Sequence, residues 1–408
     1  MKKILKDYSL SRIFRTANTS ERLFYIFFLF NVIVVLIPTW KGSFIADYMD
    51  IEDFVGLVNR IARFFNLIIA LFLIANNVPK QSSLFNISLV LLVVMLLSKI
   101  ANLTFEEITQ PIDIFVFNVA LFCSFKPRYI HDNLYIIITF LFVVWSVAPV
   151  LYYPIAPAYD KMMLFASEAD ALEEVSTFCG FAKHRNVYGY YCCVAVILTL
   201  FSNYNKFLKA ALLIAMGIGL FMSASRSNVA GLAVAIAYYY FFSGSYKQKI
   251  LFVIVAATLL YWGYGFAVSS ESRLLDTSGR EELNRASYAM FQESPIFGYG
   301  KGTVTNITNY RGAKLPPHNY LFSTLLDYGL VAFIPFVIFL FLLLKVSGRK
   351  SRTFLIYIYV VGVMQPCFGL YSPAQIQLII YLLVIAFNNS RMNNNETIAA
   401  ISSKPCLK

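Results

Sequence analysis

Charged side chains are scarce in this chain. Asp, Glu, Lys and Arg make up 14% of its 408 residues, whereas a soluble globular protein carries about 25%. Hydrophobic residues make up 59%, and many of them fall in runs long enough to cross a bilayer as helices. The composition therefore excludes an ordinary soluble protein and predicts a polytopic membrane protein. Transmembrane β-strands are alternating segments of about 10 residues, so the longer uninterrupted runs predict helices.

Motifs for metal and thiol chemistry are also missing. The six cysteines form no CxxC pair, which argues against both a disulfide framework and a zinc site. There are three histidines and no HExxH, and no GxSxG motif is present. We therefore expect no metal and no cofactor. The N-terminus lacks a cleavable signal pattern, so we expect the first apolar run to stay as a membrane helix.

Apolar runs recur along the whole chain. They predict an all-α polytopic integral membrane protein with about 12 transmembrane helices, in which residues 1–408 form a single membrane domain. Residues 319–329 are expected to form a short helix that leads into the tenth run. The runs cover residues 23–40, 61–78, 82–103, 112–125, 130–152, 187–203, 207–225, 228–243, 250–268, 330–344, 353–370 and 375–388.

The distribution of positive charge predicts the topology. The net charge is +12, and most Lys and Arg residues fall in segments that an even number of spans places in the cytoplasm. This preference explains the basic balance without a nucleic-acid partner. Two long loops, residues 153–186 and 269–318, then lie on the opposite side, which in a bacterium is the periplasm. We expect a location in the bacterial inner membrane.

The second loop, residues 269–318, is the most polar stretch between apolar runs. It carries six bases and five acids. Positive charge on the translocated side runs against the usual preference, and an anionic ligand is one reason for it. We therefore hypothesise that this loop holds the working site and that the helices carry it.

Two arginines are candidates for holding an anion. Arg226 lies between two apolar runs, where an arginine is usually functional or paired, although snorkelling to lipid headgroups is the simpler interpretation. Arg280 falls in the first turn of a predicted helix that begins with a Ser278–Glu281 capping box. The helix N-terminus and the guanidinium fork both suit phosphate, but an ion pair with a neighbouring glutamate stays an alternative.

Two further features of the loop concern packing. Leu283, Ala286, Met290 and Phe291 fall on one helical face, giving an amphipathic helix that could lie on the bilayer surface. The glycine-rich stretch 295–302 follows a helix rather than a strand, so it fails the context of a dinucleotide-binding loop. We interpret it as a turn that lets the chain pass close to other elements.

His318 is the candidate base. It follows Pro316-Pro317 and precedes Asn319. A neutral imidazole is suited to take a proton from a hydroxyl near pH 7, although a lone histidine is more often structural.

These motifs form a pattern along the chain. In order, they are Lys-His-Arg-Asn186, Ser-Arg226, Gly-Arg280, Pro295-x-x-Gly-Tyr-Gly300, His318-Asn319 and Gly329. Over about residues 175–345 this pattern resembles the O-antigen ligase and polymerase superfamily of bacterial membrane glycosyltransferases. The resemblance implies a GT-C-like helical membrane fold. It also implies transfer, without metal or cofactor, of a glycan from undecaprenyl diphosphate to a sugar hydroxyl on the periplasmic face.

The resemblance assigns roles to particular residues. Arg226 and Arg280, with Arg185 as a weaker candidate, would bind the diphosphate, His318 would be the base, and Asn319 would contribute to substrate binding. The acceptor would be the lipid A core for a ligase, or a lipid-linked repeat for a polymerase. Gly329 is followed by Ala332, where the family pattern often has a second glycine.

Other functions stay open at this point. A ligase is slightly favoured over a polymerase by the His-Asn motif and the pair of arginines. Twelve spans alone also suit a transporter or flippase, for which cations are expected at the midplane of the bundle. A protein-glycosylating oligosaccharyltransferase of the same superfamily usually carries an extra C-terminal domain. Membrane lipids are the remaining expected partners.

Overall fold

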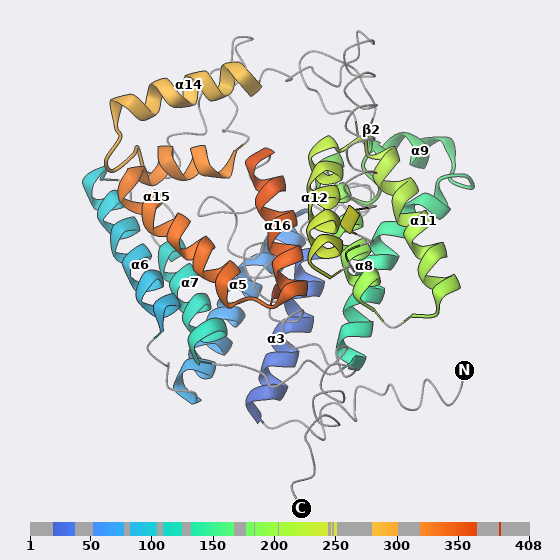
Figure 1. The fold of residues 1–408 in the computed structure, drawn as a ribbon, viewed down its shortest axis with the longest axis horizontal. Helices are drawn as coiled ribbons and strands as arrows, with labels where there is room; N and C mark the ends of the chain where they lie inside the picture. Colours follow the sequence, from blue (N-terminus) through green and yellow to red (C-terminus); the bar gives the residue numbers. More distant parts are fainter. Residues whose placement is uncertain are drawn as a thin grey trace, which may run out of the picture. The chain divides into compact units, whose positions relative to one another are not determined.

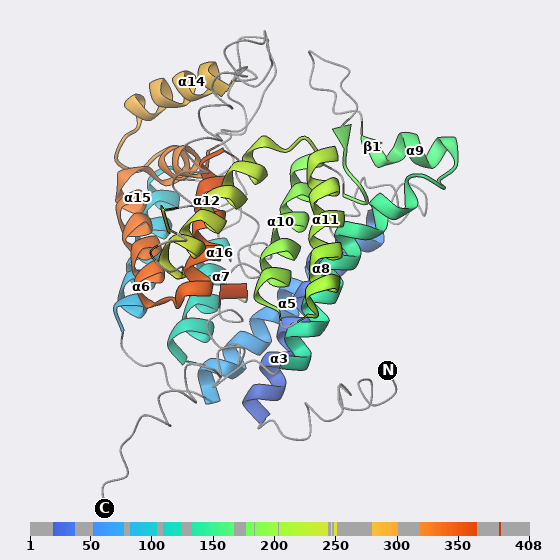
Figure 2. The same cartoon turned by 45° about the vertical axis from the view of Figure 1, so that its right-hand side comes forward.

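The computed structural model describes residues 19–36, 52–76, 82–103, 109–124, 132–166, 177–182, 184–202, 204–243, 246, 249–250, 280–300, 319–364 and 383–384. These residues are nearly all helical, as Figures 1 and 2 show. The chain divides into two compact units, each built from segments that are not contiguous in sequence. The boundary between the units falls within helix α12 (Arg226–Ser243).

The first unit comprises residues 1–80, 119–229 and 378–408. Helices α8, α10 and α11 pack on one another, and α3 packs on α5 and α8. Two-residue strands pair antiparallel, with Phe165 opposite Phe178. The elements are α3 (Thr19–Leu36), α5 (Glu52–Asn76), the π-helix η2 (Val119–Ser124), α8 (Asp132–Tyr152), α9 (Ala158–Leu164), β1 (Phe165–Ala166), β2 (Thr177–Phe178), α10 (Arg185–Phe201), α11 (Lys206–Met222) and the start of α12.

The second unit comprises residues 81–118 and 230–377. Its central element is α15 (Tyr320–Val346), which packs along α6 and also contacts α14 and α16. The other helices are α6 (Ser83–Ala101), α7 (Thr109–Asn118), the remainder of α12, α14 (Arg280–Glu293) and α16 (Arg349–Met364). Ser82 is the N-cap of α6 and Asn319 is the N-cap of α15. Each side chain accepts a hydrogen bond from a backbone N–H of the first turn, as the N-cap preference of these residue types predicts.

Three described helices are long and apolar enough to cross a membrane. They are Ser83–Ala101, Tyr135–Tyr152 and Tyr320–Val346. The prediction of an all-α chain with membrane-length apolar helices is confirmed in part, since the described residues are nearly all helical. The number of about 12 spans stays a prediction, because the runs 250–268 and 375–388 lie almost wholly outside the described residues. A single membrane domain over residues 1–408 likewise stays a prediction.

Most predicted runs coincide with helices, and three details differ. Helix α5 begins at Glu52, well before the predicted run 61–78, because a polar amphipathic turn precedes the apolar part. The short run 112–125 is an α-helix that continues as the π-helix η2. The loop 153–186 contains α9 and the strand pair, which hydropathy does not reveal. The predicted short helix 319–329 is confirmed as the first part of α15, since Gly329 interrupts that helix.

Candidate functional site

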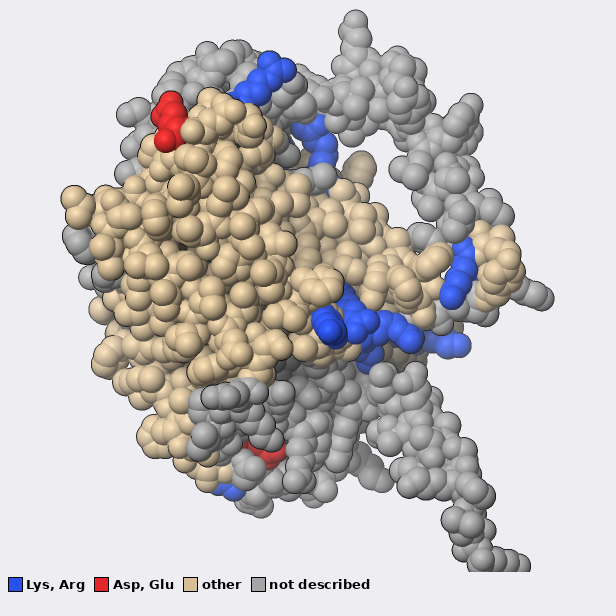
Figure 3. All heavy atoms as spheres, turned by 60° about the vertical axis from the view of Figure 1, so that its left-hand side comes forward, with Lys and Arg blue, Asp and Glu red and all other residues tan. Residues whose placement is uncertain are grey.

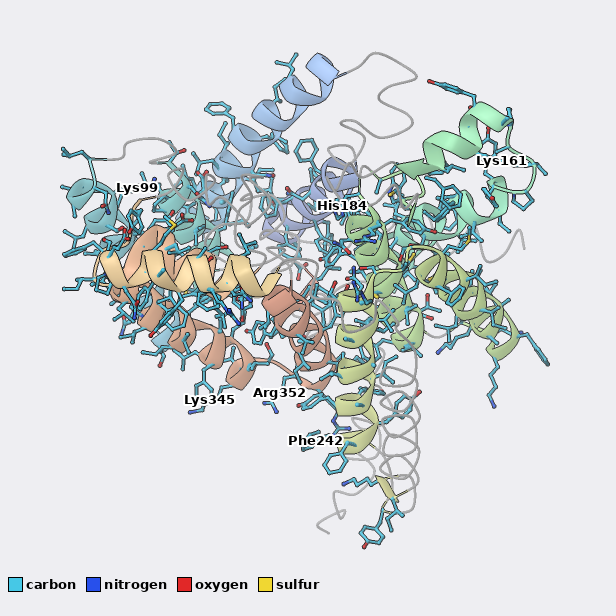
Figure 4. The ribbon with its side chains drawn as sticks, turned by 90° about the horizontal axis from the view of Figure 1, so that it is seen from above. Lys99, Lys161, His184, Phe242, Lys345 and Arg352 are labelled. Atoms are coloured by element: carbon cyan, nitrogen blue, oxygen red, sulfur yellow. The ribbon has the colours of Figure 1, made fainter. Side chains whose placement is uncertain are left out.

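Helix α10 begins at the cationic segment that precedes it. His184 is the N-cap, and its Nδ1 accepts a hydrogen bond from the Asn186 backbone N–H at 3.0 Å. Figure 4 labels His184 at this end of α10. Arg185 is the first residue of the helix and is half-buried. The histidine therefore has a structural role at a helix start, and Arg185 stands where the helix dipole is positive.

Helix α12 begins in the same unit, next to the start of α10. Ala224 has a left-handed backbone conformation (φ 48°) and lies in the short connection between α11 and α12. Ser225 Oγ donates to Asn186 Oδ1 at 2.7 Å and accepts from Asn228 Nδ2 at 2.8 Å. Asn228 Nδ2 also donates to the Asn186 backbone oxygen at 2.9 Å. This network joins the first turns of the two helices.

A glycine makes the close approach of these turns feasible. A Cβ atom built on Gly189 would lie 2.9 Å from Asn228 Nδ2 and 3.0 Å from Ser225 Cβ. Real Cβ contacts are essentially never shorter than 3.0 Å, so a side chain at this position requires either the Asn228 amide or the helix starts to shift. Gly189 therefore leaves room for the Ser225 and Asn228 side chains between the α10 and α12 starts.

The joined helix starts carry two arginines. Arg185 and Arg226 are each the first residue of their helix, and Arg226 is exposed. Each arginine is adjacent in sequence to a residue of the hydrogen-bonded network. The network therefore fixes the backbone positions from which the two arginine side chains extend. Two helix N-termini with two guanidinium groups form an arrangement suited to an anion with several oxygens, such as a diphosphate.

In the second unit, α14 packs on α15 through its apolar face. Leu283 is 2% exposed and forms a core pair with Leu326 of α15. Ala286, Met290, Phe291 and Tyr299 pack against this pair. The predicted apolar face of α14 is confirmed, and its partner is α15, so the interpretation that this face lies on the bilayer surface was wrong.

The turn after α14 docks on a break in α15. Tyr299 and Gly300 donate backbone hydrogen bonds to Leu326 and Asp327 at 2.7 and 2.9 Å. Leu330 and Val331 donate to Pro295 and Ile296 at 2.9 and 3.3 Å. These four bonds pair an irregular stretch with the interrupted part of the helix. The interpretation of residues 295–302 as a closely packed turn is confirmed for the described residues 295–300.

Two glycines make this docking feasible. Gly298 and Gly329 both have φ near +67°. A Cβ atom on Gly329 would lie 2.1 Å from the Ile296 oxygen, and one on Gly298 would lie 2.5 Å from the Leu326 oxygen. Ala332, the position that departs from the family pattern, is fully buried.

The end of helix α6 also contacts the turn. This helix carries a buried charge that the sequence analysis did not identify. Ser98 Oγ donates to the Phe297 oxygen at 2.5 Å, and Asn102 Nδ2 lies 3.4 Å from the same oxygen. Lys99 and Asp327 are both 0% exposed, and Asp113 of α7 is 3% exposed. Lys99 and Asp113 could have been found from the sequence, because each is an ionisable residue inside an apolar run. Placing such a residue in a membrane costs free energy, so it is usually functional or paired.

Tyr299 ties the turn to the end of α14. Its Oη lies 2.9 Å from the Met290 oxygen and 2.8 Å from Glu293 Oε2. Desolvation and the neighbouring Glu293 carboxylate raise the pKa of Tyr299 to about 12. The tyrosine is therefore protonated at neutral pH and serves as a hydrogen-bond donor.

The predicted site residues fall in both units. Arg185 and Arg226 lie in the first unit, at the joined helix starts. Arg280 begins α14 in the second unit, but its side chain lies outside the described residues, as does His318. Asn319 is the N-cap of α15, and its Oδ1 accepts from the Leu321 N–H at 2.8 Å. The roles assigned to these five residues stay predictions.

No cluster of three or more His, Cys, Asp or Glu residues that could hold a metal ion occurs among the residues the structure describes.

Comparison with known proteins identifies a related family. Residues 211–337 match the family described as O-antigen ligase. This segment contains Arg226, Arg280, His318 and both glycines of the docked turn, whereas Arg185 lies before it. No curated protein matches the chain significantly. The resemblance noted in the sequence is confirmed over residues 211–337, which are similar to the O-antigen ligase family.

Proposed function

We propose that this chain is an O-antigen ligase-type glycosyltransferase. It moves a glycan from undecaprenyl diphosphate to a sugar hydroxyl on the lipid A core, at the periplasmic face of the bacterial inner membrane. The observation that carries the proposal is the joining of the α10 and α12 starts, with Arg185 and Arg226 as first helical residues, because this arrangement suits a diphosphate. The match of residues 211–337 to the O-antigen ligase family supports the choice of donor.

The reaction requires stabilisation of the negative charge that develops on the leaving group. The acceptor oxygen attacks the anomeric carbon, and the bond between that carbon and the diphosphate oxygen breaks. Negative charge then builds up on undecaprenyl diphosphate. Guanidinium groups fixed beside that charge stabilise the transition state more than the ground state, and each such group typically contributes about 2.7–4 kcal/mol. Arg226 and Arg280 take this role, with Arg185 as an additional contact.

The acceptor must also lose a proton. His318 accepts it from the sugar hydroxyl as the new glycosidic bond forms, so no proton is left on the product oxygen. Asn319 follows directly and caps α15, which anchors the chain next to the histidine. In this mechanism the arginines neutralise the diphosphate, and no metal is required.

A lipopolysaccharide gel of a strain that lacks the gene tests the proposal. A ligase predicts loss of all O-antigen from the core while lipid-linked polymer accumulates. A core that bears a single repeat unit would instead identify a repeat-unit polymerase, which the same family match accommodates. Accumulation of lipid-linked units on the cytoplasmic face alone would indicate a flippase and would overturn the enzymatic proposal.

A further inference from the structure

Helix α15 exposes one continuous apolar stripe. Ile334, Val337, Ile338 and Phe341 are 55%, 41%, 44% and 65% exposed. Their spacing of three, four and seven residues places them on one face of the helix. In a membrane-spanning helix such a face contacts acyl chains. Four residues after Phe341, the same face reaches Lys345, which is also exposed.

Cations gather where this stripe ends. Residues 345–352 contain Lys345, Arg349, Lys350 and Arg352, and the sequence holds no Asp or Glu between Tyr328 and Asn395. Figure 3 shows Lys and Arg side chains gathered in a patch on a largely uncharged face, and Figure 4 labels Lys345 and Arg352 side by side at the corner between α15 and α16. The segment around this corner therefore supplies no carboxylate of its own.

One of these cations holds the corner in place. Arg352 Nε donates to the Leu344 oxygen at 2.9 Å, and its Nη2 donates to the Lys345 oxygen at 3.2 Å. The guanidinium thus caps the last carbonyls of α15. Lys345 and Arg349 are exposed on either side of this cap, and Arg349 is the first residue of α16, where the helix dipole favours an anion.

We propose that the α15–α16 corner is a binding site for an anionic phospholipid. Lys345 and Arg349 bind the headgroup phosphate, and an acyl chain lies along Ile334, Val337, Ile338 and Phe341. A soluble phosphate would use only the cations, whereas a phospholipid uses the charged corner and the apolar stripe together. The continuity of the two on one helical face therefore favours the lipid.

Lipid retention by the purified full-length protein tests this site. The protein is kept in neutral detergent micelles that contain equal fractions of phosphatidylglycerol and phosphatidylcholine, and retained lipid is counted by native mass spectrometry. The wild type is expected to retain phosphatidylglycerol preferentially. The double variant Lys345→Gln/Arg349→Gln should lower this preference about tenfold, since each cation near a membrane surface contributes to the attraction of anionic lipid.

A matched control removes the same charge elsewhere. Lys206 and Arg285 are both exposed, and neither lies in the α15–α16 corner. The Lys206→Gln/Arg285→Gln variant should keep the wild-type preference. Equal retention of both lipids by the wild type, or equal loss in the two double variants, would overturn the proposal.

A soluble competitor separates the lipid from a free phosphate. Glycerol phosphate carries the headgroup chemistry without acyl chains, so it should displace little phosphatidylglycerol. Displacement at concentrations close to those of the lipid would show that the cations alone make the site, and the proposal of a phospholipid site would then be wrong.

Discussion

Asn228 Nδ2 donates a hydrogen bond to the Asn186 backbone oxygen at 2.9 Å and so ties the first turn of α12 to the first turn of α10. Both asparagines lie in the polar first turns of helices that are otherwise largely apolar. The bond matters for function because Arg185 precedes Asn186 directly, and Arg226 lies two residues before Asn228. The separation of the two arginines therefore depends on how closely the helix starts approach.

Replacing Gly189 with alanine tests this dependence. The new Cβ would lie 2.9 Å from Asn228 Nδ2 and 3.0 Å from Ser225 Cβ, so the Asn228 amide that joins the helix starts must be displaced, or the helix starts must separate. We expect glycan transfer to fall at least about tenfold, since small displacements of positioning groups are costly in catalysis. Transfer is measured in membrane vesicles with a lipid-linked glycan donor, at matched protein levels.

Gly217→Ala is the control for this variant. Gly217 is also helical, but a Cβ there meets no atom within 4 Å. Both substitutions raise helix propensity equally. If the two variants transfer glycan at the same rate, the spacing of the helix starts does not control the reaction.

Removal of the arginines proposed to bind the anion should abolish transfer without preventing insertion. Arg226→Ala and Arg280→Ala are each expected to lower the rate about 100- to 1000-fold, the usual effect of deleting one group that stabilises transition-state charge. Arg226→Lys should recover only part of the rate, because an ammonium lacks the planar fork. The exposed Arg285, on the same helix as Arg280, provides the control variant Arg285→Ala.

The His318→Ala variant tests the proposed base. We expect loss of transfer while the donor lipid is still bound, because the proposed mechanism assigns the diphosphate to the arginines and not to the histidine. Binding of labelled donor and the rate of transfer are measured on the same preparation. A rate close to that of the wild type would remove the assignment of His318.

The docked turn predicts a stability effect at Gly329. Alanine there would have to adopt φ +67° with its Cβ 2.1 Å from the Ile296 oxygen. A backbone with φ 67° and ψ −171° is adopted essentially by glycine alone and costs roughly 1–3 kcal/mol for another residue, and the clash adds to this cost. We expect poor accumulation and a lowered melting temperature in detergent, again with Gly217→Ala as control. Unchanged melting would mean that the turn does not dock as described.

The helices of this fold were predictable from the sequence, because their signal is local. Runs of apolar residues marked α6, α8 and α12 within a few residues, and Gly329 correctly divided α15. The amphipathic face of α14 was found from its 3.6-residue period. Its partner was not, because a hydrophobic face has the same pattern whether lipid or Leu326 covers it.

Contacts between segments far apart in the chain could not be predicted from the sequence. Arg185 and Arg226 were each recognised as cations beside a membrane end, but nothing in their neighbourhoods indicated that Asn186 would bond to Ser225 and Asn228. The buried Lys99 was overlooked because it is a single charge within the long apolar run 82–103, which was interpreted only as a membrane span.

A reciprocal pair of amides between α3 and α5 gives a last prediction. Asn31 Nδ2 donates to Asn66 Oδ1 at 2.8 Å, and Asn66 Nδ2 donates to Asn31 Oδ1 at 2.6 Å, with both residues buried. Replacing either residue with leucine leaves the other amide without this partner, at a cost of about 1–3 kcal/mol. The double variant Asn31→Leu/Asn66→Leu removes both polar groups and should therefore melt at a higher temperature than either single variant. Thermal melting of the four proteins forms a double-mutant cycle, with the exposed Asn76→Leu as control. Additive losses in the double variant would show that the two amides do not stabilise the helix pair through each other.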